Sequence, residues 1–185
     1  MTLIIGIDPG SQKTGFGVID VVGAKTGYVT SGIIRLPEGP LPERLKIIFD
    51  SVSSIIAQYG PVTMAVEDIF FARDPRAALK LGQARGAAIV AGVNAGLSVA
   101  EYAARTVKQS VVGNGAASKE QVQYMVTRLL KLASAPAEDA ADALAVALCH
   151  ARTLATTANM TTRIHYSRGR MKTLAGTAKQ EKPVK

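Results

Sequence analysis

The sequence predicts an α/β fold: a five-stranded mixed sheet, part antiparallel meander and part parallel strands, flanked by helices. Three apolar runs near the N-terminus are joined by short Gly-containing turns, which is typical of a meander. Two later apolar runs, at 62–67 and 97–102, each follow a stretch with helical periodicity, so they can lie parallel to the first strand. A chain of 185 residues, 48% of them hydrophobic, suits one domain with a sizeable core.

The first part of the chain supplies the meander and a crossover helix. Strands are expected at 3–8, 16–22 and about 28–36, separated by the turns "GSQKTG" and "GAKTG". A helix follows, because apolar residues recur at helical spacing until the pattern ends at Gly60-Pro61. These apolar residues are Leu41, Leu45, Ile48, Val52, Ile55 and Ile56.

The rest of the chain alternates strands with helices. The run "VTMAVE" is predicted to be a buried strand that ends at Glu67, and "LSVAEY" a fifth strand. An Ala- and Gly-rich helix over 75–95 separates them. A Gly-rich loop is expected next, followed by helices over 118–132 and from about 136 to 154.

Composition limits the class of protein. The single cysteine, Cys149, cannot form an intramolecular disulfide and suits a reducing compartment; we expect it in the core. The N-terminus lacks the basic segment and long apolar run of a signal peptide, and no apolar run is long enough to cross a membrane. We therefore expect a cytoplasmic protein that does not associate with membranes.

The C-terminal segment differs from the rest of the chain. Residues 159–185 hold seven basic residues and one acid, a net +6 of the chain's +8, without apolar periodicity. We expect a folded domain over 1–158 and a basic, disordered tail over 159–185. Binding to a polyanion and simple solubilisation are both consistent with this composition.

Four carboxylates are candidates for one site. Asp8 ends the first predicted strand and Glu67 the fourth, and sites in such sheets form at the carboxyl ends of strands. Asp139 and Asp142 are three residues apart on the last predicted helix, so they share a face that continues through buried-type residues. Capping of the helix N-terminus is the alternative, and it accounts for Asp142 less well than for Asp139.

Such a cluster of acids indicates cations. Four carboxylates without matching basic residues repel one another and hold together comfortably only around positive ions. Oxygen ligands in open, hydrated coordination suit Mg²⁺ or Mn²⁺, and two ions about 3.5–4 Å apart could hold the attacking and leaving oxygens of a phosphodiester. No Ser/His/Asp or Cys/His arrangement is evident, and His150 is expected on a helix surface.

Four blocks of the sequence resemble one known family. "GIDPGSQKTGFGVI", "AVEDIFFARDPRAALKLGQARGAAI", "YAARTVKQSVVGNGAASKEQVQYMV" and "DAADALAVALCHA" have the order and spacing of the RuvC family of Holliday-junction resolvases, over residues 3–154. The resemblance implies a ribonuclease H-like fold and a Mg²⁺-dependent crossover junction endodeoxyribonuclease. Such an enzyme serves DNA recombination and the repair of DNA damage. A homodimer nicks four-way junctions in symmetric pairs, and a metal-activated water leaves a 5′-phosphate and a 3′-hydroxyl.

The resemblance also assigns roles to the acids and to partners. Asp8, Glu67, Asp139 and Asp142 match the family's catalytic, metal-binding tetrad, with two Mg²⁺ per active site and Mn²⁺ as a possible substitute. Some relatives have His at the position of Asp139. A bacterial, cytoplasmic protein acting at the nucleoid is implied, and a RuvA–RuvB branch-migration complex as partner. The tail lies outside the resemblance.

Five residues are candidates for DNA contacts. Lys108 and Lys119 flank "VVGNGAASK" and by resemblance lie near the scissile phosphate, although each could be an ordinary solvated lysine. Phe70 matches an aromatic that stacks on unpaired bases, with closure of the core as the alternative. Arg76 and Lys80 could line the junction arms, although a charged helix face explains them nearly as well.

Three further features leave alternatives open. Arg73 and Arg85 have the same two interpretations as Arg76 and Lys80. The small residues Ala78, Gly82 and Gly86 allow either packing on the sheet or a subunit interface. "IGIDPGSQKTG" also resembles the first phosphate loop of actin- and hexokinase-like ATPases, but 185 residues leave no room for their second domain.

Two rival functions are weaker. A module that only binds junctions would have no use for convergent acids, because they repel DNA. A ribonuclease H or ribosomal-RNA-processing relative is the nearest rival among nucleases, and the run from Val107 to Lys119 together with the Phe70 segment favours the resolvase.

Overall fold

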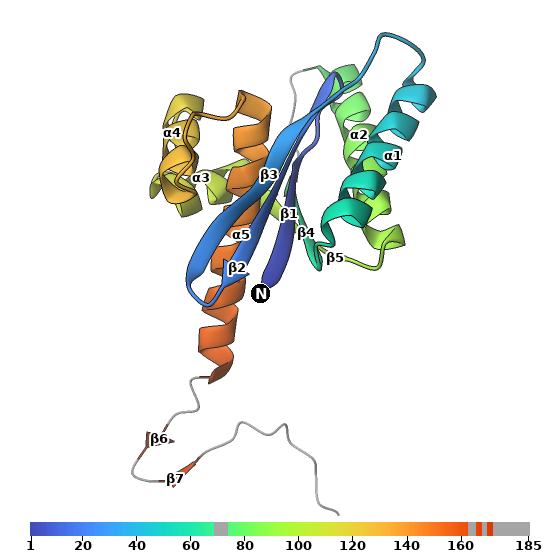
Figure 1. The fold of residues 1–185 in the computed structure, drawn as a ribbon. Coiled ribbons are helices and arrows are strands. Elements are labelled where there is room, and N and C mark those ends of the chain that lie inside the picture. Colours follow the sequence, from blue (N-terminus) through green and yellow to red (C-terminus); the bar gives the residue numbers. More distant parts are fainter. Residues whose placement is uncertain (69–73, 163–165, 168–169, 172–185) are drawn as a thin grey trace, which may run out of the picture.

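A five-stranded sheet with strand order β3-β2-β1-β4-β5 forms the centre of the molecule (Figure 1). The computed structural model describes residues 1–68, 74–162, 166–167 and 170–171. The strands are β1 (Thr2–Asp8), β2 (Lys13–Val22), β3 (Lys25–Arg35), β4 (Thr63–Asp68) and β5 (Ser98–Ala103). β1, β2 and β3 pair antiparallel, whereas β4 runs parallel to both β1 and β5. The predicted mixed sheet is confirmed.

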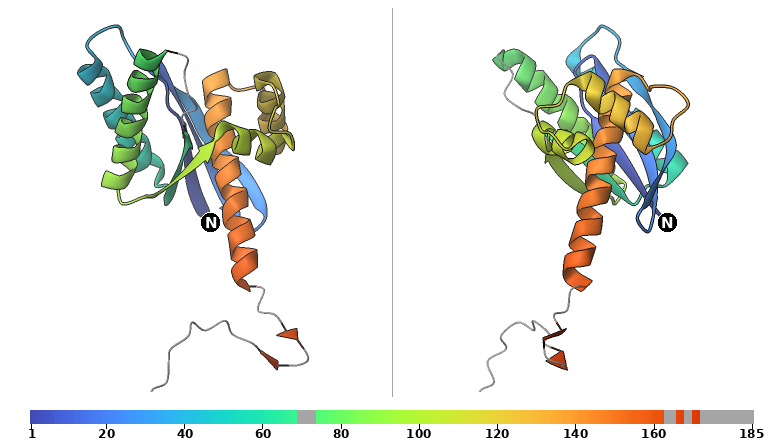
Figure 2. Two further views of the ribbon diagram at one scale, coloured as in Figure 1. Left: turned by 180° about the vertical axis from the view of Figure 1, so that it is seen from behind. Right: turned by 90° about the vertical axis from the view of Figure 1, so that its left-hand side faces the viewer.

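Helices cover both faces of this sheet (Figures 1 and 2). They are α1 (Leu41–Tyr59), α2 (Pro75–Asn94), α3 (Ala104–Val112), α4 (Lys119–Leu129) and α5 (Glu138–Thr162). α1 and α2 pack on one face, and α5 lies along the other with α3 and α4 outside it. Among the described residues, no helix combines the length and apolar character needed to span a membrane.

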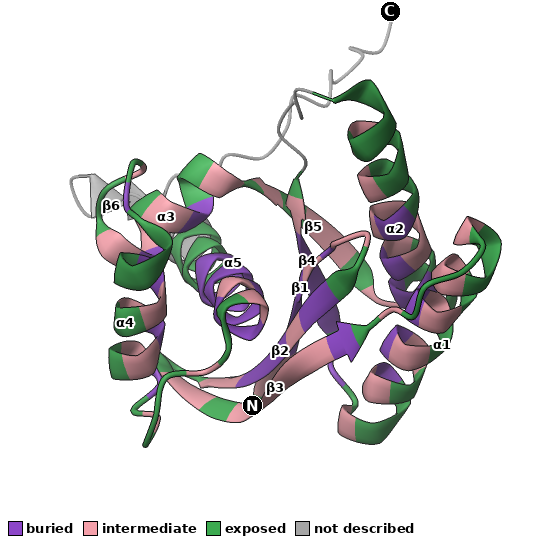
Figure 3. Cartoon of the chain, turned by 90° about the horizontal axis from the view of Figure 1, so that it is seen from above, coloured by how far each residue is buried: buried purple, intermediate pink, exposed green. Residues whose placement is uncertain are grey.

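Alternation along β1 builds a separate core on each face. Ile5 and Ile7 pack towards α1 and α2, whereas Ile4 packs towards α5, because successive side chains point to opposite faces. Gly6 takes the next position towards α5, and a Cβ there would collide with the backbone of Ala143. This glycine therefore lets α5 approach the sheet closely. In Figure 3 the buried turns of α5 face the strands of the sheet.

The region between β5 and α4 differs from the prediction. Residues 104–112, expected in a loop, form α3, which ends at Gly113 in the left-handed conformation (φ 85°). Gly113, one of the glycines that suggested a loop, thus ends a short helix. α4 begins with a capping box in which Ser118 and Gln121 exchange side-chain and backbone hydrogen bonds.

The C-terminal helix is longer than predicted. α5 continues to Thr162, past the expected end near 154 and past the expected domain boundary at 158. Beyond it, Tyr166–Ser167 and Arg170–Met171 pair antiparallel as β6 and β7. The rest of the tail lies outside the described residues, so its separation from the domain stays a prediction.

The expectation that His150 lies on a helix surface is wrong. Its side chain is buried, with Nε2 3.0 Å from Thr63 Oγ1 and Nδ1 2.8 Å from the Tyr102 hydroxyl. Thr63 Oγ1 donates to the Ser98 carbonyl (3.1 Å), so the network fits a neutral imidazole that donates through Nε2 and accepts from Tyr102. Burial lowers the pKa of His150 in agreement with that state. Cys149 is buried in the core as expected.

Candidate active site

The parallel pairing of β1 with β4 brings two carboxylates together. Ile7 pairs with Val66, so Asp8 and Glu67 follow side by side at the carboxyl ends of the two central strands. Their side chains share a hydrogen bond, and both line a hollow of about 320 Å³. We call this feature the acid hollow; Leu81, Val107 and Val122 are among its apolar lining.

The helix α5 adds the other two acids. Asp142 lines the acid hollow, and Asp139, one turn earlier, is half-buried and lies close enough for its charge to affect Asp8. Gly15 of β2 makes this placement possible, because a Cβ at that position would collide with the carbonyl of Asp139. Because Gly15 has no side chain, the start of α5, with Asp139, can lie close to the ends of the strands.

Burial and mutual repulsion raise the pKa values of three of these acids. Burial, followed by the charges of Glu67, Asp142 and Asp139, raises the pKa of Asp8 to about 8. Burial and the charge of Asp142 raise the pKa of Glu67, and burial raises that of Asp142. At neutral pH the Asp8–Glu67 pair therefore keeps a shared proton, because two buried carboxylates within hydrogen-bonding reach of each other would repel if both were ionised.

Two lysines face the acids across the hollow. Lys108 from α3 and Lys119 from the first turn of α4 both line it. The Lys119 ammonium lies 3.8 Å from Asp142 Oδ2 and also pairs with Glu138. The bond to Glu138 and the charge of Asp142 help to raise the pKa of Lys119, so it stays positive. The structure thus places both predicted lysines beside the acids.

The donor set fits a hard divalent cation. Carboxylate oxygens are the ligands that Mg²⁺ and Mn²⁺ prefer, and a cation would replace the proton that Asp8 now keeps. Across the described ranges, no three Asp, Glu, His or Cys side chains already stand close enough to enclose an ion. Asp8, Glu67 and Asp142, which line one hollow, are the residues that would hold it.

The other predicted residues do not reach the acid hollow. Arg76 and Lys80 are exposed near the start of α2 and are not among the residues that line it. Phe70 and Arg73 lie outside the described residues. Their proposed contacts with DNA stay predictions.

Arg85 has a role that its sequence position did not reveal. Its Nε donates to the backbone carbonyl of Glu67 (3.3 Å), and its guanidinium pairs with Asp68 (3.5 Å) and Glu101. The side chain therefore fastens α2 to the ends of β4 and β5 beneath Glu67, rather than facing outward towards DNA arms. The sequence held one clue to this role. Arg85 is a basic residue on a helix between two predicted strands, and each of these strands carries an acid near its end.

Two of the predicted small residues of α2, Gly82 and Gly86, lie off the face of the helix that packs on the sheet. Ala84, Ala88, Ala91 and Gly92 form the buried face of this helix. Gly82, by contrast, is exposed, and a Cβ on Gly86 would meet nothing within 4 Å. Packing on the sheet is therefore excluded as the reason for these two glycines.

The fold and the acids at the ends of its central strands define a ribonuclease H-like nuclease. The model of the family described as crossover junction endodeoxyribonuclease RuvC matches residues 4–150. The chain belongs to this RuvC family.

Relatives and solved structures agree with this membership. A crossover junction endodeoxyribonuclease RuvC of Teredinibacter turnerae is 58% identical over 175 residues, covering 92% of this chain and 99% of the relative. The structure of Thermus thermophilus RuvC in complex with a Holliday junction substrate has a TM-score of 0.80 and 38% identity, covering 85% of this chain and 97% of that one. The yeast mitochondrial Holliday junction resolvase shares the fold, with a TM-score of 0.64, 13% identity and coverage of 84% and 80%.

Proposed function

We propose that the acid hollow is the active site with which this junction endonuclease cuts DNA. As a member of the RuvC family, the protein is an endonuclease that resolves Holliday junctions. The observation that carries the assignment of the site is the meeting of Asp8, Glu67 and Asp142 in one hollow at the carboxyl ends of the two central strands, with Lys108 and Lys119 beside them. The raised pKa of Asp8 agrees with this crowding of acids. Asp8, Glu67, Asp139 and Asp142 are the proposed catalytic residues and the ligands of two divalent ions.

The residues of the hollow divide the chemistry between them. A bound Mg²⁺, or Mn²⁺ in its place, would polarise the phosphodiester and lower the pKa of an attacking water. Asp8 and Glu67 give up their shared proton to hold the cation. Lys108 and Lys119 neutralise the charge of the phosphate and orient it above the acids. Hydrolysis in this arrangement leaves a 5′-phosphate and a 3′-hydroxyl.

A homodimer accounts for paired, symmetric nicks. Leu79, Val90 and Val93 of α2 are large apolar side chains that are 69%, 56% and 58% exposed. With Gly82 and Gly86 they follow the helix at spacings that form one stripe, and the glycines allow a second helix to approach closely. A two-fold axis along this stripe would present two identical active sites to a symmetric junction.

A charge on the stripe tests the dimer. Leu79→Glu should give a monomer in sedimentation and should uncouple the two nicks, so that singly nicked junctions accumulate. Val62→Glu is the matched control, because Val62 is 59% exposed and immediately precedes β4, away from the stripe on α2. Equal loss of the dimer in both variants would contradict an interface on α2.

The remaining partners follow from the resemblance and from position. Arg76 and Lys80 would contact the junction arms, and Phe70 would stack on bases at the open crossover. The protein would act in the bacterial cytoplasm at the nucleoid and receive junctions from a RuvA–RuvB branch-migration complex.

A comparison of substrates tests the proposed function. The protein is offered a mobile four-way junction, a linear duplex and an RNA–DNA hybrid with Mg²⁺. We expect paired nicks in opposite strands of the junction and none in the other two. Cleavage of the hybrid alone would instead indicate a ribonuclease H activity, and cleavage without added divalent metal would contradict the role given to the acids.

A further inference from the structure

A second hollow, of about 390 Å³, lies at the same end of the sheet as the acids. It is found where β2 begins, where β3 ends and where α1 starts. The charged residues that line it are Lys13, Arg35, Arg44 and Glu38. We call it the basic hollow, because three cations surround it with one acid.

Two of these cations face each other across neighbouring strands. Lys13 and Arg35 are direct partners at the end of the β2–β3 ladder. Like charges directly opposite each other destabilise a sheet. Both residues are exposed, and neither forms an ion pair with a carboxylate in the described part of the chain. Stability of the sheet therefore does not explain why they are paired.

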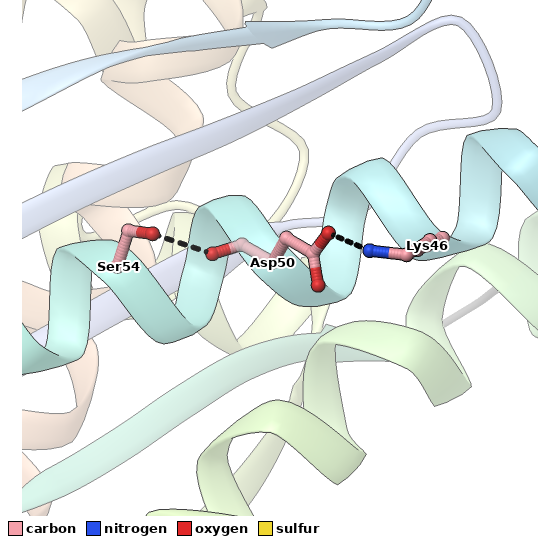
Figure 4. A network of polar contacts seen from close by, with 3 residues as sticks. All are labelled: Lys46, Asp50 and Ser54. Carbon is pink, nitrogen blue, oxygen red and sulfur yellow. Dashed lines mark hydrogen bonds and ion pairs between the residues drawn. The ribbon is translucent and has the colours of Figure 1, made fainter.

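The third cation has an unused donor. The Nε of Arg44 on α1 is buried and has no hydrogen-bond partner among the described residues. Lys46 on the same helix shows the ordinary arrangement: it pairs with Asp50, whose carbonyl accepts from Ser54 Oγ at 2.8 Å (Figure 4). Because buried donors in proteins are almost always satisfied, the unused Nε marks Arg44 as a side chain that the described residues leave short of an acceptor.

The register of the sheet places the basic hollow beside the acids. Gly15 pairs with Asp8, and the carbonyl of Asp139 packs against Gly15. Lys13 precedes Gly15 by two residues, so its side chain and that of Arg35 opposite it leave the sheet on the α5 face, whereas Arg44 belongs to α1 on the other face. The basic hollow therefore lies around the open end of the β2–β3 ladder. A polyanion crossing this end of the sheet would meet the acid hollow and Lys13 in succession.

We propose that the basic hollow binds a phosphate of the DNA backbone next to the nick, an inference that rests on the proposed function. Arg44 lines the hollow, and its planar guanidinium can hold phosphate oxygens through parallel hydrogen bonds. Turning outward to do so would also bring its buried Nε to an acceptor. Lys13 and Arg35 gain the counter-charge that the protein does not supply. Contacts of this kind position a strand without reading its bases.

Salt dependence of binding tests the proposal. We compare wild type with Lys13→Gln/Arg44→Gln on a four-way junction, without divalent metal. Losing two phosphate contacts should reduce the slope of log K against log salt by about 1.8. Between about 50 and 200 mM salt the wild type should then lose roughly tenfold more affinity than the variant. Lys25→Gln/Lys46→Gln, which removes equal charge from the far end of β3 and a paired site on α1, should keep the wild-type slope.

Two single variants sharpen the result. Arg44→Lys should keep the slope and lower the affinity, because the charge stays and the fork of donors is lost. Glu38→Gln should tighten binding, since it removes the one acid of the hollow. A neutral methylphosphonate at one position near the nick should weaken binding by the wild type but not by the Lys13→Gln/Arg44→Gln variant, which locates the contact.

Three outcomes would overturn the proposal. They are an unchanged slope in the Lys13→Gln/Arg44→Gln variant, an equal fall of the slope in both double variants, and equal weakening of wild type and this variant by the methylphosphonate at every position near the nick. Lys13→Gln alone, at an exposed strand start, gives about half the change in slope if the double variant fails to fold. Because the slope is read from binding, absence of nicking by the wild type would contradict the proposed function and leave this comparison intact.

Discussion

The helix α5 carries two polar groups that are treated in opposite ways. His150 is buried and satisfied, since Thr63 and Tyr102 use both ring nitrogens. Asp142, eight residues or about 12 Å earlier, lies among carboxyls whose pKa values are raised by burial and mutual repulsion. A polar group that stabilises a fold finds its partners within the fold. Asp142 has a partner in Lys119, but burial and the neighbouring acids still raise its pKa, as expected of a group that awaits a ligand.

The largest expected effect on activity comes from replacing one of the acids of the hollow. Asp142→Asn should reduce junction nicking by about a thousandfold or more, because losing a metal ligand is expected to cost several kcal/mol of transition-state stabilisation. Junction binding should persist or tighten, since the variant repels phosphate less. Nicking rates and binding isotherms on one labelled junction measure both.

A matched variant separates this effect from a general loss of acid charge. Glu120→Gln removes a fully exposed carboxylate close to Lys119. It should change nicking by no more than a few-fold. Parallel loss of binding and nicking in Asp142→Asn would show that Asp142 supports the fold instead of the chemistry.

At the satisfied end the same kind of substitution should cost stability instead. His150→Leu removes the ring that bonds to both Thr63 and Tyr102. Although Thr63 keeps its bond to the Ser98 carbonyl, losing two buried hydrogen bonds should lower the free energy of unfolding by about 1–3 kcal/mol. Urea titration measures this. Ala155→Leu, on an exposed position of the same helix, should stay within about 0.5 kcal/mol of wild type. Unchanged stability of His150→Leu would mean that the network contributes nothing net.

The two ends should also respond to pH with opposite signs. The pKa of Asp8 is raised to about 8, so the metal-free protein loses stability as pH rises from about 4 to 8, where the unfolded chain releases a proton that the folded chain keeps. The pKa of His150 is lowered by burial, so stability is lost as pH falls below about 6.5.

Melting curves in a chelating buffer test this contrast. Asp8→Asn should melt above wild type near pH 8, and the difference should vanish near pH 4. His150→Leu should lack the loss of stability that wild type shows below about pH 6.5. A metal-free Asp8→Asn that melts below wild type at pH 8 would contradict the raised pKa of Asp8.

Local patterns were enough to predict much of the fold and the meeting of the acids. Turn residues and hydrophobic periodicity mark the strands, and parallel neighbours bring Asp8 and Glu67 to one edge. α3 was missed because Gly113 is as typical of a loop as of a helix end. The burial of His150, the contacts of Arg85 and the basic hollow depend on partners from distant elements. A single sequence without an alignment carries little information about such partners.

Proton release on metal binding tests the central claim most directly. At pH 7, in a weakly buffered solution containing an indicator dye, Mn²⁺ or Mg²⁺ is titrated into the metal-free protein. We expect about one proton released per active site, because the cation displaces the proton that the Asp8–Glu67 pair shares, and almost none from Asp8→Asn. Metal binding by the wild type without proton release would contradict the claim that Asp8 and Glu67 share a proton until a cation displaces it.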